Sequence, residues 1–306
     1  MTVQFRRRFL AAFVAGFAGL YAVGAQAAVS PLELVGPISD YKIYVTQNVR
    51  KLAADVRVFT AAVKAGDIEK AKKLYAPTRT SYERVEPVAE LFTDLDQSID
   101  SRADDHEKAE KDPAFIGFHR IEYSLWTLKS TKDLNPVADK LLADVLELQK
   151  RLGALTFPPE KVVGGAAVLM EEVAATKISG EENRYSHTDL WDFQSNFEGA
   201  YKIVELLRPL VVKQDKPFAE KADANFKVVF DTLAKYRTAD GGFETYSKLT
   251  ERDRKMLAGR VNTLAEDLSK LRGMLGLNRV RPVGARSFPA DPGLFGVGQV
   301  FASENC

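Results

Sequence analysis

The sequence predicts an all-α protein built as two antiparallel helical bundles that share one elongated body. Between about residues 35 and 278, apolar side chains recur every three or four positions, which is the period of one helix face. No segment shows the period-two alternation of a half-buried strand. The helical stretches, roughly seven or eight, are joined by short connections rich in Gly, Pro and Asp, which is typical of antiparallel bundles.

The first 28 residues have the three parts of a secretory signal peptide. Arg6–Arg8 precede an uncharged apolar run, Phe9–Val23, and the small residues Ala25-Gln26-Ala27 follow it. The run of 15 residues is shorter than a bilayer span, which needs about 20. We therefore expect cleavage near Ala27 and export of a soluble mature chain to the periplasm or beyond the cell.

Two long helical patterns open the mature chain. Apolar spacing from Ile38 to Val63 predicts the first helix, and Gly66-Asp67 supplies its stop and the N-cap of the second. The second pattern runs towards Phe92 and contains Pro77 and Pro87. Because proline lacks the N–H of a helix ladder, these two residues predict kinks or breaks.

The rest of the chain divides into an acidic stretch, a series of helices and a tail. The polar stretch runs from Asp94 to Asp112, and helical spacing then returns in residues 137–155, after Pro158-Pro159, and in residues 193–207, 218–236 and 257–275. Packing in a hydrophobic core explains the apolar faces of all these predicted helices, so none of them is taken as a functional site. Residues 279–306 have three prolines, four glycines and no helical period, which predicts a disordered tail.

Composition excludes several classes of protein. Lys and Arg number 43 against 42 for Asp and Glu, so the chain has no large excess of basic charge for a nucleic-acid backbone. The single cysteine, Cys306, excludes an intrachain disulfide and a thiolate zinc site. Any bound metal must therefore be held by oxygen and imidazole ligands.

The informative motif is Gly117-Phe118-His119-Arg120-Ile121-Glu122. His119 and Glu122 stand three residues apart, so a helix places both on one face, where they can point at a common ion. Glu83 and Glu86 repeat this spacing, and Asp94, Asp96 and Asp100 follow shortly afterwards. A histidine with several carboxylates suits iron, manganese or zinc. The alternative is a solvent-facing pair worth a few tenths of a kcal/mol.

These residues resemble a known family. The motif at 117–122, continued by Tyr123-Ser124-Leu125-Trp126, is similar to the G-x-H-x-x-E signature of imelysin-like proteins. Residues 185–200, Tyr-Ser-His-Thr-Asp-Leu-Trp-Asp-Phe-Gln-Ser-Asn-Phe-Glu-Gly-Ala, resemble a second stretch found in the EfeO group of periplasmic iron-uptake components. The resemblance covers about residues 35–278, which is nearly all of the predicted helical domain at residues 29–278. No N-terminal cupredoxin domain is expected, which is the pattern of the short EfeM form.

The resemblance implies a metal-binding cleft between two helical halves. It assigns His119 and Glu122 as ligands and suggests Glu83, Glu86, Asp100 and Glu182, with Glu181 as the alternative to Glu182. His187, Asp189 and Asp192 are expected to line the cleft or to fix its helices, with structural support favoured. His106, among charged neighbours, is expected to be a solvated loop residue.

The function that the resemblance implies is capture of ferrous or ferric ion, with zinc or calcium as ions bound in vitro, and delivery to an EfeU-type inner-membrane permease beside an EfeB-type peroxidase. Two alternatives remain open. Imelysin relatives include reported metallopeptidases, but the H-E-x-x-H order of zinc peptidases is absent from this chain. A polysaccharide-binding protein would bridge to alginate through a divalent ion, helped by Trp126, Trp191 and tyrosines.

Overall fold

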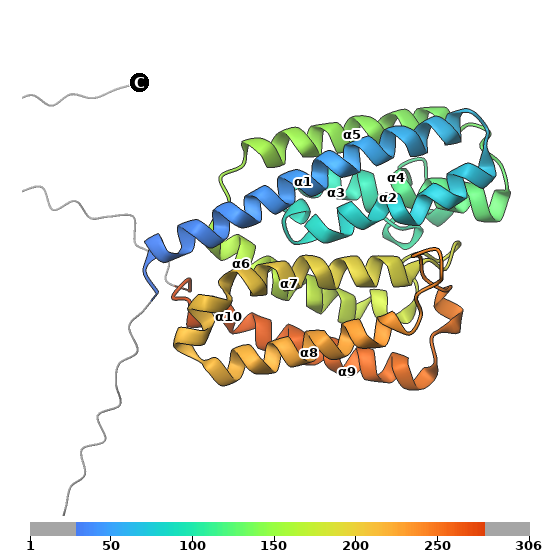
Figure 1. Ribbon diagram of the computed structural model, residues 1–306. Helices are drawn as coiled ribbons and strands as arrows, with labels where there is room; N and C mark the ends of the chain where they lie inside the picture. Colours follow the sequence, from blue (N-terminus) through green and yellow to red (C-terminus); the bar gives the residue numbers. More distant parts are fainter. Residues whose placement is uncertain (1–28, 279–306) are drawn as a thin grey trace, which may run out of the picture.

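A computed structural model describes residues 29–278, which fold into helices and connecting loops (Figure 1). Within this range the only β structure is one isolated bridge between Arg237 and Phe243, so the all-α prediction is confirmed. The predicted signal peptide, residues 1–28, and the predicted tail, residues 279–306, lie outside the described residues. Within the described range no helix combines the length and the apolar character that crossing a membrane requires.

The helices form two layers that run along one elongated body (Figure 1). The first layer has α1 (Pro31–Lys64), α2 (Ile68–Ala89), α3 (Thr93–Asp100), α4 (Gly117–Tyr123) and α5 (Asn135–Ala154). The second has α6 (Pro159–Ala175), α7 (Asp189–Gln214), α8 (Lys216–Ala234), α9 (Glu251–Ser269) and the short α10 (Leu271–Met274). Helix α1 packs on α2 and α5, α6 packs on α7 and α9, and the α2–α7 contact joins the layers.

Local sequence explains where the first helices begin. Ser30 caps α1 in a reciprocal capping box with Glu33. Gly66, with φ of +74°, ends the turn after α1, and the Asp67 side chain accepts a hydrogen bond from the backbone N–H of Lys70 at the start of α2. The predicted stop and N-cap are therefore confirmed.

Helix α2 is continuous through Pro77 and Pro87, so the predicted breaks do not occur. A proline at position 87 leaves the carbonyl of Glu83 without its helical donor. Asn196 on α7 replaces that donor, because its Nδ2 lies 3.2 Å from the Glu83 carbonyl oxygen. A tertiary contact thus compensates the local cost of the proline.

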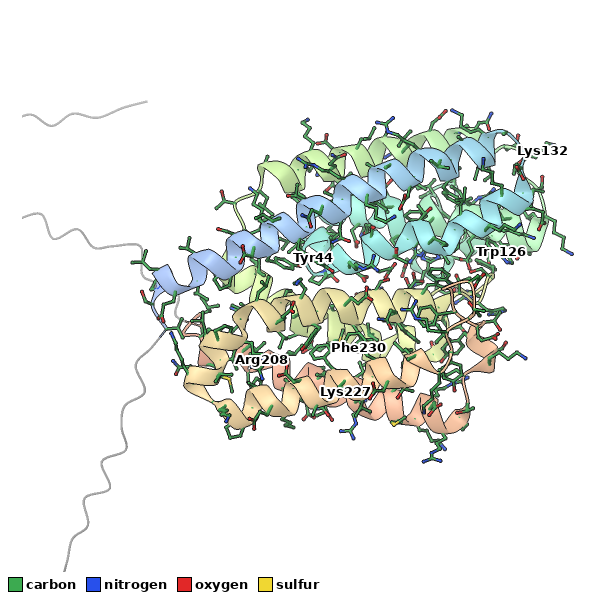
Figure 2. The ribbon with its side chains drawn as sticks, viewed as in Figure 1. Tyr44, Trp126, Lys132, Arg208, Lys227 and Phe230 are labelled. Atoms are coloured by element: carbon green, nitrogen blue, oxygen red, sulfur yellow. The ribbon has the colours of Figure 1, made fainter. Side chains whose placement is uncertain are left out.

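The two layers approach closely along α2. A Cβ atom built on Gly165 of α6 would lie 2.3 Å from the carbonyl oxygen of Pro87, and one built on Gly199 of α7 would lie 2.3 Å from that of Arg84. Buried apolar residues of both layers form one continuous core. Tyr44 and Phe230 lie on opposite sides of the junction, where they line a shallow groove of about 420 Å³ (Figure 2).

Candidate metal site

Gly117 determines where the helix that carries the histidine begins. Its φ is +80°, a region that favours glycine, and an added Cβ would lie 2.3 Å from the carbonyl oxygen of Ile99. The absence of a side chain therefore lets α4 start directly against the last turn of α3. This contact brings His119 on α4 next to Asp100, the final residue of α3.

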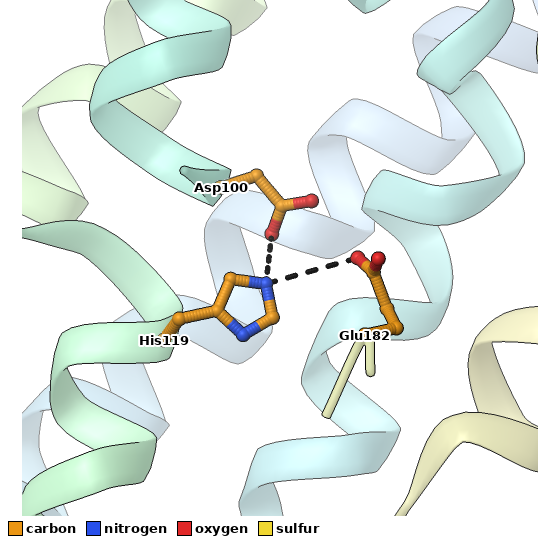
Figure 3. Close-up of side chains that lie close together, drawn as sticks. All are labelled: Asp100, His119 and Glu182. Atoms are coloured by element: carbon orange, nitrogen blue, oxygen red, sulfur yellow. Dashed lines mark ion pairs between the residues drawn. The ribbon is translucent and has the colours of Figure 1, made fainter. Parts of the chain in front are cut away.

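The His119 imidazole is 2% exposed and faces carboxylates on both sides. Its Nδ1 lies 3.1 Å from Oε2 of Glu122, one helical turn further along α4. Its Nε2 lies 3.4 Å from Oδ1 of Asp100 and 3.7 Å from Oε1 of Glu182 (Figure 3). One ligand atom from each of Asp100, His119 and Glu182 falls within 4.8 Å of the other two. This spacing is suitable for three ligands of one ion.

Glu122 holds the other face of the histidine. Its Oε1 accepts hydrogen bonds from the backbone N–H groups of Tyr185 and Ser186, at 3.1 and 2.8 Å, and from the Ser186 hydroxyl at 2.7 Å. A carboxylate fixed in this way orients the imidazole and leaves Nε2 for an ion. Since Glu122 is fully buried, the solvent-facing alternative for this pair is wrong.

Arg79 on α2 is the main feature that sequence reasoning missed. Its side chain is fully buried and bonds to Asp100, Glu83 and Glu182, with a distance of 3.2 Å to Oε1 of Glu182. Its Nε also lies 3.4 Å from Oδ1 of Asp192. One guanidinium therefore contacts four carboxylates, which lie on α2, α3, the loop before α7, and α7.

Glu83 and Glu86 were both predicted as ligands. In the structure they lie next to the cluster of Asp100, His119 and Glu182, and other side chains bond to them. Lys177, which is 1% exposed, lies 2.6 Å from Oε1 of Glu86 and 3.2 Å from Oε2 of Glu83. Asn196 donates to Oε2 of both carboxylates, at 2.9 Å to Glu83 and 2.6 Å to Glu86. These contacts place the two glutamates next to the three-residue cluster, with Lys177 and Asn196 as their partners.

Charge explains the protonation states of the cluster. Burial and the charge of Arg79 oppose protonation of His119, but contacts with Asp100, Glu122 and Glu182 outweigh them and raise its pKa well above the usual value. Burial raises the pKa of Glu182, but Lys177, His119 and Arg79 together hold it well below the usual range. The contacts within the ion-free site therefore favour the protonated form of His119 and the ionised form of Glu182.

The other predicted residues lie around this cluster. Glu182 is buried in it, whereas Glu181 is exposed and pairs with Arg184. Asp189 accepts a hydrogen bond from the backbone N–H of Asn183 at 3.1 Å, which fixes the loop that carries Glu182.

The remaining two histidines lie outside the cluster. The His187 side chain is exposed. The expectation that His106 is solvated is wrong, because its half-buried ring packs 5.6 Å from Phe115 and lies 2.9 Å from the Ser101 hydroxyl.

An acidic pocket of about 460 Å³ opens beside the cluster. Asp100 and Glu182 line it, together with Glu86, Glu90, Asp96, Asp105 and Glu172. The only basic side chain that lines this pocket is Arg102, which lies 3.2 Å from Oε2 of Glu182. Two residues of the three-residue cluster, Asp100 and Glu182, therefore line an acidic pocket, whereas His119 does not.

The fold and the cluster together define a class: helical proteins with a histidine and carboxylates buried between two bundles. This chain belongs to the imelysin family, whose family model matches residues 37–271. It is 66% identical over 256 residues to the iron uptake system component EfeM of Pseudomonas syringae pv. syringae, which covers 84% of this chain and 90% of that protein. It is 60% identical over 259 residues to the iron uptake system component EfeO of Yersinia pestis, over 84% of this chain and 69% of that protein.

Proposed function

We propose that this protein binds iron in the periplasm and delivers it to an inner-membrane permease, as one component of an iron-uptake system. The observation that carries the proposal is the geometry at His119, whose Nε2 faces two carboxylates while Glu122 holds Nδ1. Relatives that are named iron uptake components support iron as the cargo. The signal peptide predicted from the sequence at residues 1–28 supports the location.

Asp100, His119 and Glu182 are the proposed direct ligands. One imidazole and two carboxylates suit ferrous or ferric iron, and zinc is expected to bind the same set in vitro. Glu122 orients the histidine, and Glu83 and Glu86 lie next to these ligands, where Arg79 contacts Glu83 and Lys177 contacts both. Nε2 of His119 makes no hydrogen bond among the described residues, so an incoming ion has only a proton to displace from this nitrogen.

Calorimetric titration with Fe²⁺ under anaerobic conditions tests this assignment. His119→Ala and Asp100→Asn should each raise the Kd for Fe²⁺ by about tenfold or more. Loss of a residue that only supports a ligand already costs about tenfold to a hundredfold in metal affinity. His187→Ala is the matched control, because this histidine is exposed and lies outside the cluster. Equal affinities of the wild type and the His119→Ala variant would reject the proposed site.

We do not assign peptidase activity to the chain. In a zinc peptidase a glutamate activates water, but here Glu122 is already engaged by His119, Tyr185 and Ser186. Incubation of the zinc-loaded protein with casein should leave the casein intact. Cleavage that Glu122→Gln abolishes would contradict this part of the proposal.

The polysaccharide alternative is not favoured. A sugar-binding platform needs exposed aromatic faces, but Trp126 packs edge-on against Tyr75 at 5.4 Å and Trp191 packs against Phe243 at 5.9 Å. Both tryptophans therefore make contacts within the fold. The relatives also carry names that refer to iron uptake.

A further inference from the structure

Arg79 bonds to the same two oxygen atoms that face the histidine nitrogen. Oδ1 of Asp100 lies 3.4 Å from Nε2 of His119 and also accepts a hydrogen bond from Nη1 of Arg79. Oε1 of Glu182 lies 3.7 Å from the same nitrogen and 3.2 Å from Nη2 of Arg79. An ion held by His119, Asp100 and Glu182 would therefore share both carboxylate oxygens with a fixed positive charge.

Arg79 also contacts two further carboxylates, those of Glu83 and Asp192. Its Nη2 donates to Oε1 of Glu83, and its Nε lies 3.4 Å from Oδ1 of Asp192. The aromatic rings of Tyr75 and Phe118 lie 5.9 and 5.3 Å from the guanidinium carbon. These contacts do not involve Asp100 or Glu182, so they can hold Arg79 in place when those two carboxylates turn to an ion.

We infer that Arg79 is an internal competitor that weakens the hold of the site on its metal ion, and so permits release to a partner. The inference rests on the proposed function. A buried like charge beside a metal ion opposes binding, and the two oxygens that Arg79 occupies are those the ion needs. A site of this kind captures an ion from solution without retaining it permanently, as a delivery protein requires.

Replacing Arg79 alone has two effects, because it removes the competing cation and also leaves Asp192 without its ion-pair partner. Two variants are therefore needed to separate these effects. Arg79→Met removes the competing cation. The double variant Arg79→Met/Asp192→Asn also removes the Asp192 carboxyl that Arg79→Met alone leaves without its ion-pair partner. Asp192 forms an ion pair with Arg79 and is not among the proposed ligands.

The experiment measures Zn²⁺ and anaerobic Fe²⁺ affinity and the rate of Zn²⁺ transfer to a chelator, in the wild type, both variants and Arg79→Lys. Both Met variants should bind at least about tenfold more tightly and release Zn²⁺ correspondingly more slowly. Arg79→Lys keeps the charge and should stay within about threefold of the wild type. Circular dichroism spectra and thermal melting identify any variant that does not fold.

Weaker binding by a folded double variant would overturn the inference, because it would mean that Arg79 organises the ligands and does not compete with the ion. If Arg79→Met fails to fold, the double variant carries the test. If both Met variants fail to fold, Arg79→Lys carries it. A lysine has fewer donors for the two shared oxygens, so a loss of affinity greater than tenfold in that variant would also overturn the inference. Failure of the proposed function is distinguishable, because the wild type would then bind no ion through His119.

Discussion

At the residue scale, Gly117 shows how one missing side chain determines the position of the site. Its positive φ and its contact with the carbonyl of Ile99 let α4 begin against α3. His119 follows two residues later and meets Asp100. The motif therefore needs its glycine for backbone reasons and its histidine and glutamate for chemistry.

Gly117→Ala should destabilise the fold by about 3 kcal/mol, because the new Cβ both clashes with a backbone oxygen and disfavours the φ angle. Iron affinity should fall with it, since α4 must move away from Asp100. Gly259→Ala is the control, as nothing lies within 4 Å of its Cβ position. Denaturant unfolding and metal titration measure both effects, and an unchanged Gly117→Ala variant would contradict this account.

Asp96 provides a pH test at a residue that is not a proposed ligand, although it lines the same pocket as Asp100 and Glu182. Burial raises the pKa of Asp96 to about 6, although a hydrogen bond from Tyr82 opposes the shift. A carboxyl whose pKa is higher in the folded chain favours folding when protonated, so ionisation between about pH 4 and 6 removes stability as pH rises.

The Asp96→Asn variant should therefore be more stable than the wild type at pH 8, by about 1–2 kcal/mol, and equal to it near pH 4. Urea unfolding at both pH values measures the difference. Asp94→Asn is the comparison, because its exposed carboxylate bonds to Arg151 and should yield no gain at pH 8. A gain for Asp96→Asn that does not change with pH would refute the assignment.

At the scale of elements, α2 is the helix on which the site is organised. It carries Arg79, Glu83 and Glu86, and it lies against both α6 and α7. Gly165 and Gly199 permit that close approach, and Asn196 bonds to the carbonyl that Pro87 leaves free. The position of α2 therefore depends on contacts from the second half of the chain.

Gly199→Ala should push α7 away from α2, because its Cβ would lie 2.3 Å from the carbonyl oxygen of Arg84. We expect a loss of about 2–3 kcal/mol of unfolding free energy, as for other overpacked core positions. Gly153→Ala in α5, with nothing within 4 Å, should instead gain up to about 1 kcal/mol from helix propensity. Thermal melting of the two variants distinguishes them, and equal melting temperatures would be inconsistent with the close contact.

Sequence patterns predicted the long helices because each buries one apolar stripe, and spacing alone placed His119 and Glu122 on one face. Helix α3 was not predicted, since eight mostly polar residues leave little periodicity. Arg79 and Lys177 were not predicted as part of the site because their partners lie far away in sequence. The one local pattern that could have indicated the role of Arg79 is its spacing from Glu83, because residues four apart on a helix can form an ion pair.

At the scale of the whole molecule, the two halves share one core and one site. The proposed ligands Asp100 and His119 come from the first half, whereas Glu182 comes from the loop before α7. The charged cluster therefore joins both bundles, and the body is expected to unfold in a single transition.

Metal binding should stabilise this single unit. At a free Fe²⁺ concentration of about a hundred times Kd, the unfolding free energy should rise by about 2.7 kcal/mol. A chelator should reverse the gain, and His119→Ala should abolish it. Calorimetric melting curves test the expectation, and two separated transitions, or stabilisation that survives in His119→Ala, would count against it.

The acidic pocket beside His119 also bears on how quickly a cation arrives. Seven carboxyl groups of the described residues line it, against the single guanidinium of Arg102, while the chain as a whole is nearly neutral. Such a local field steers diffusing cations towards the opening, and salt screens it over roughly 8 Å at physiological ionic strength. Stopped-flow association of Zn²⁺ should therefore slow markedly as sodium chloride is added, while the rate of dissociation changes little.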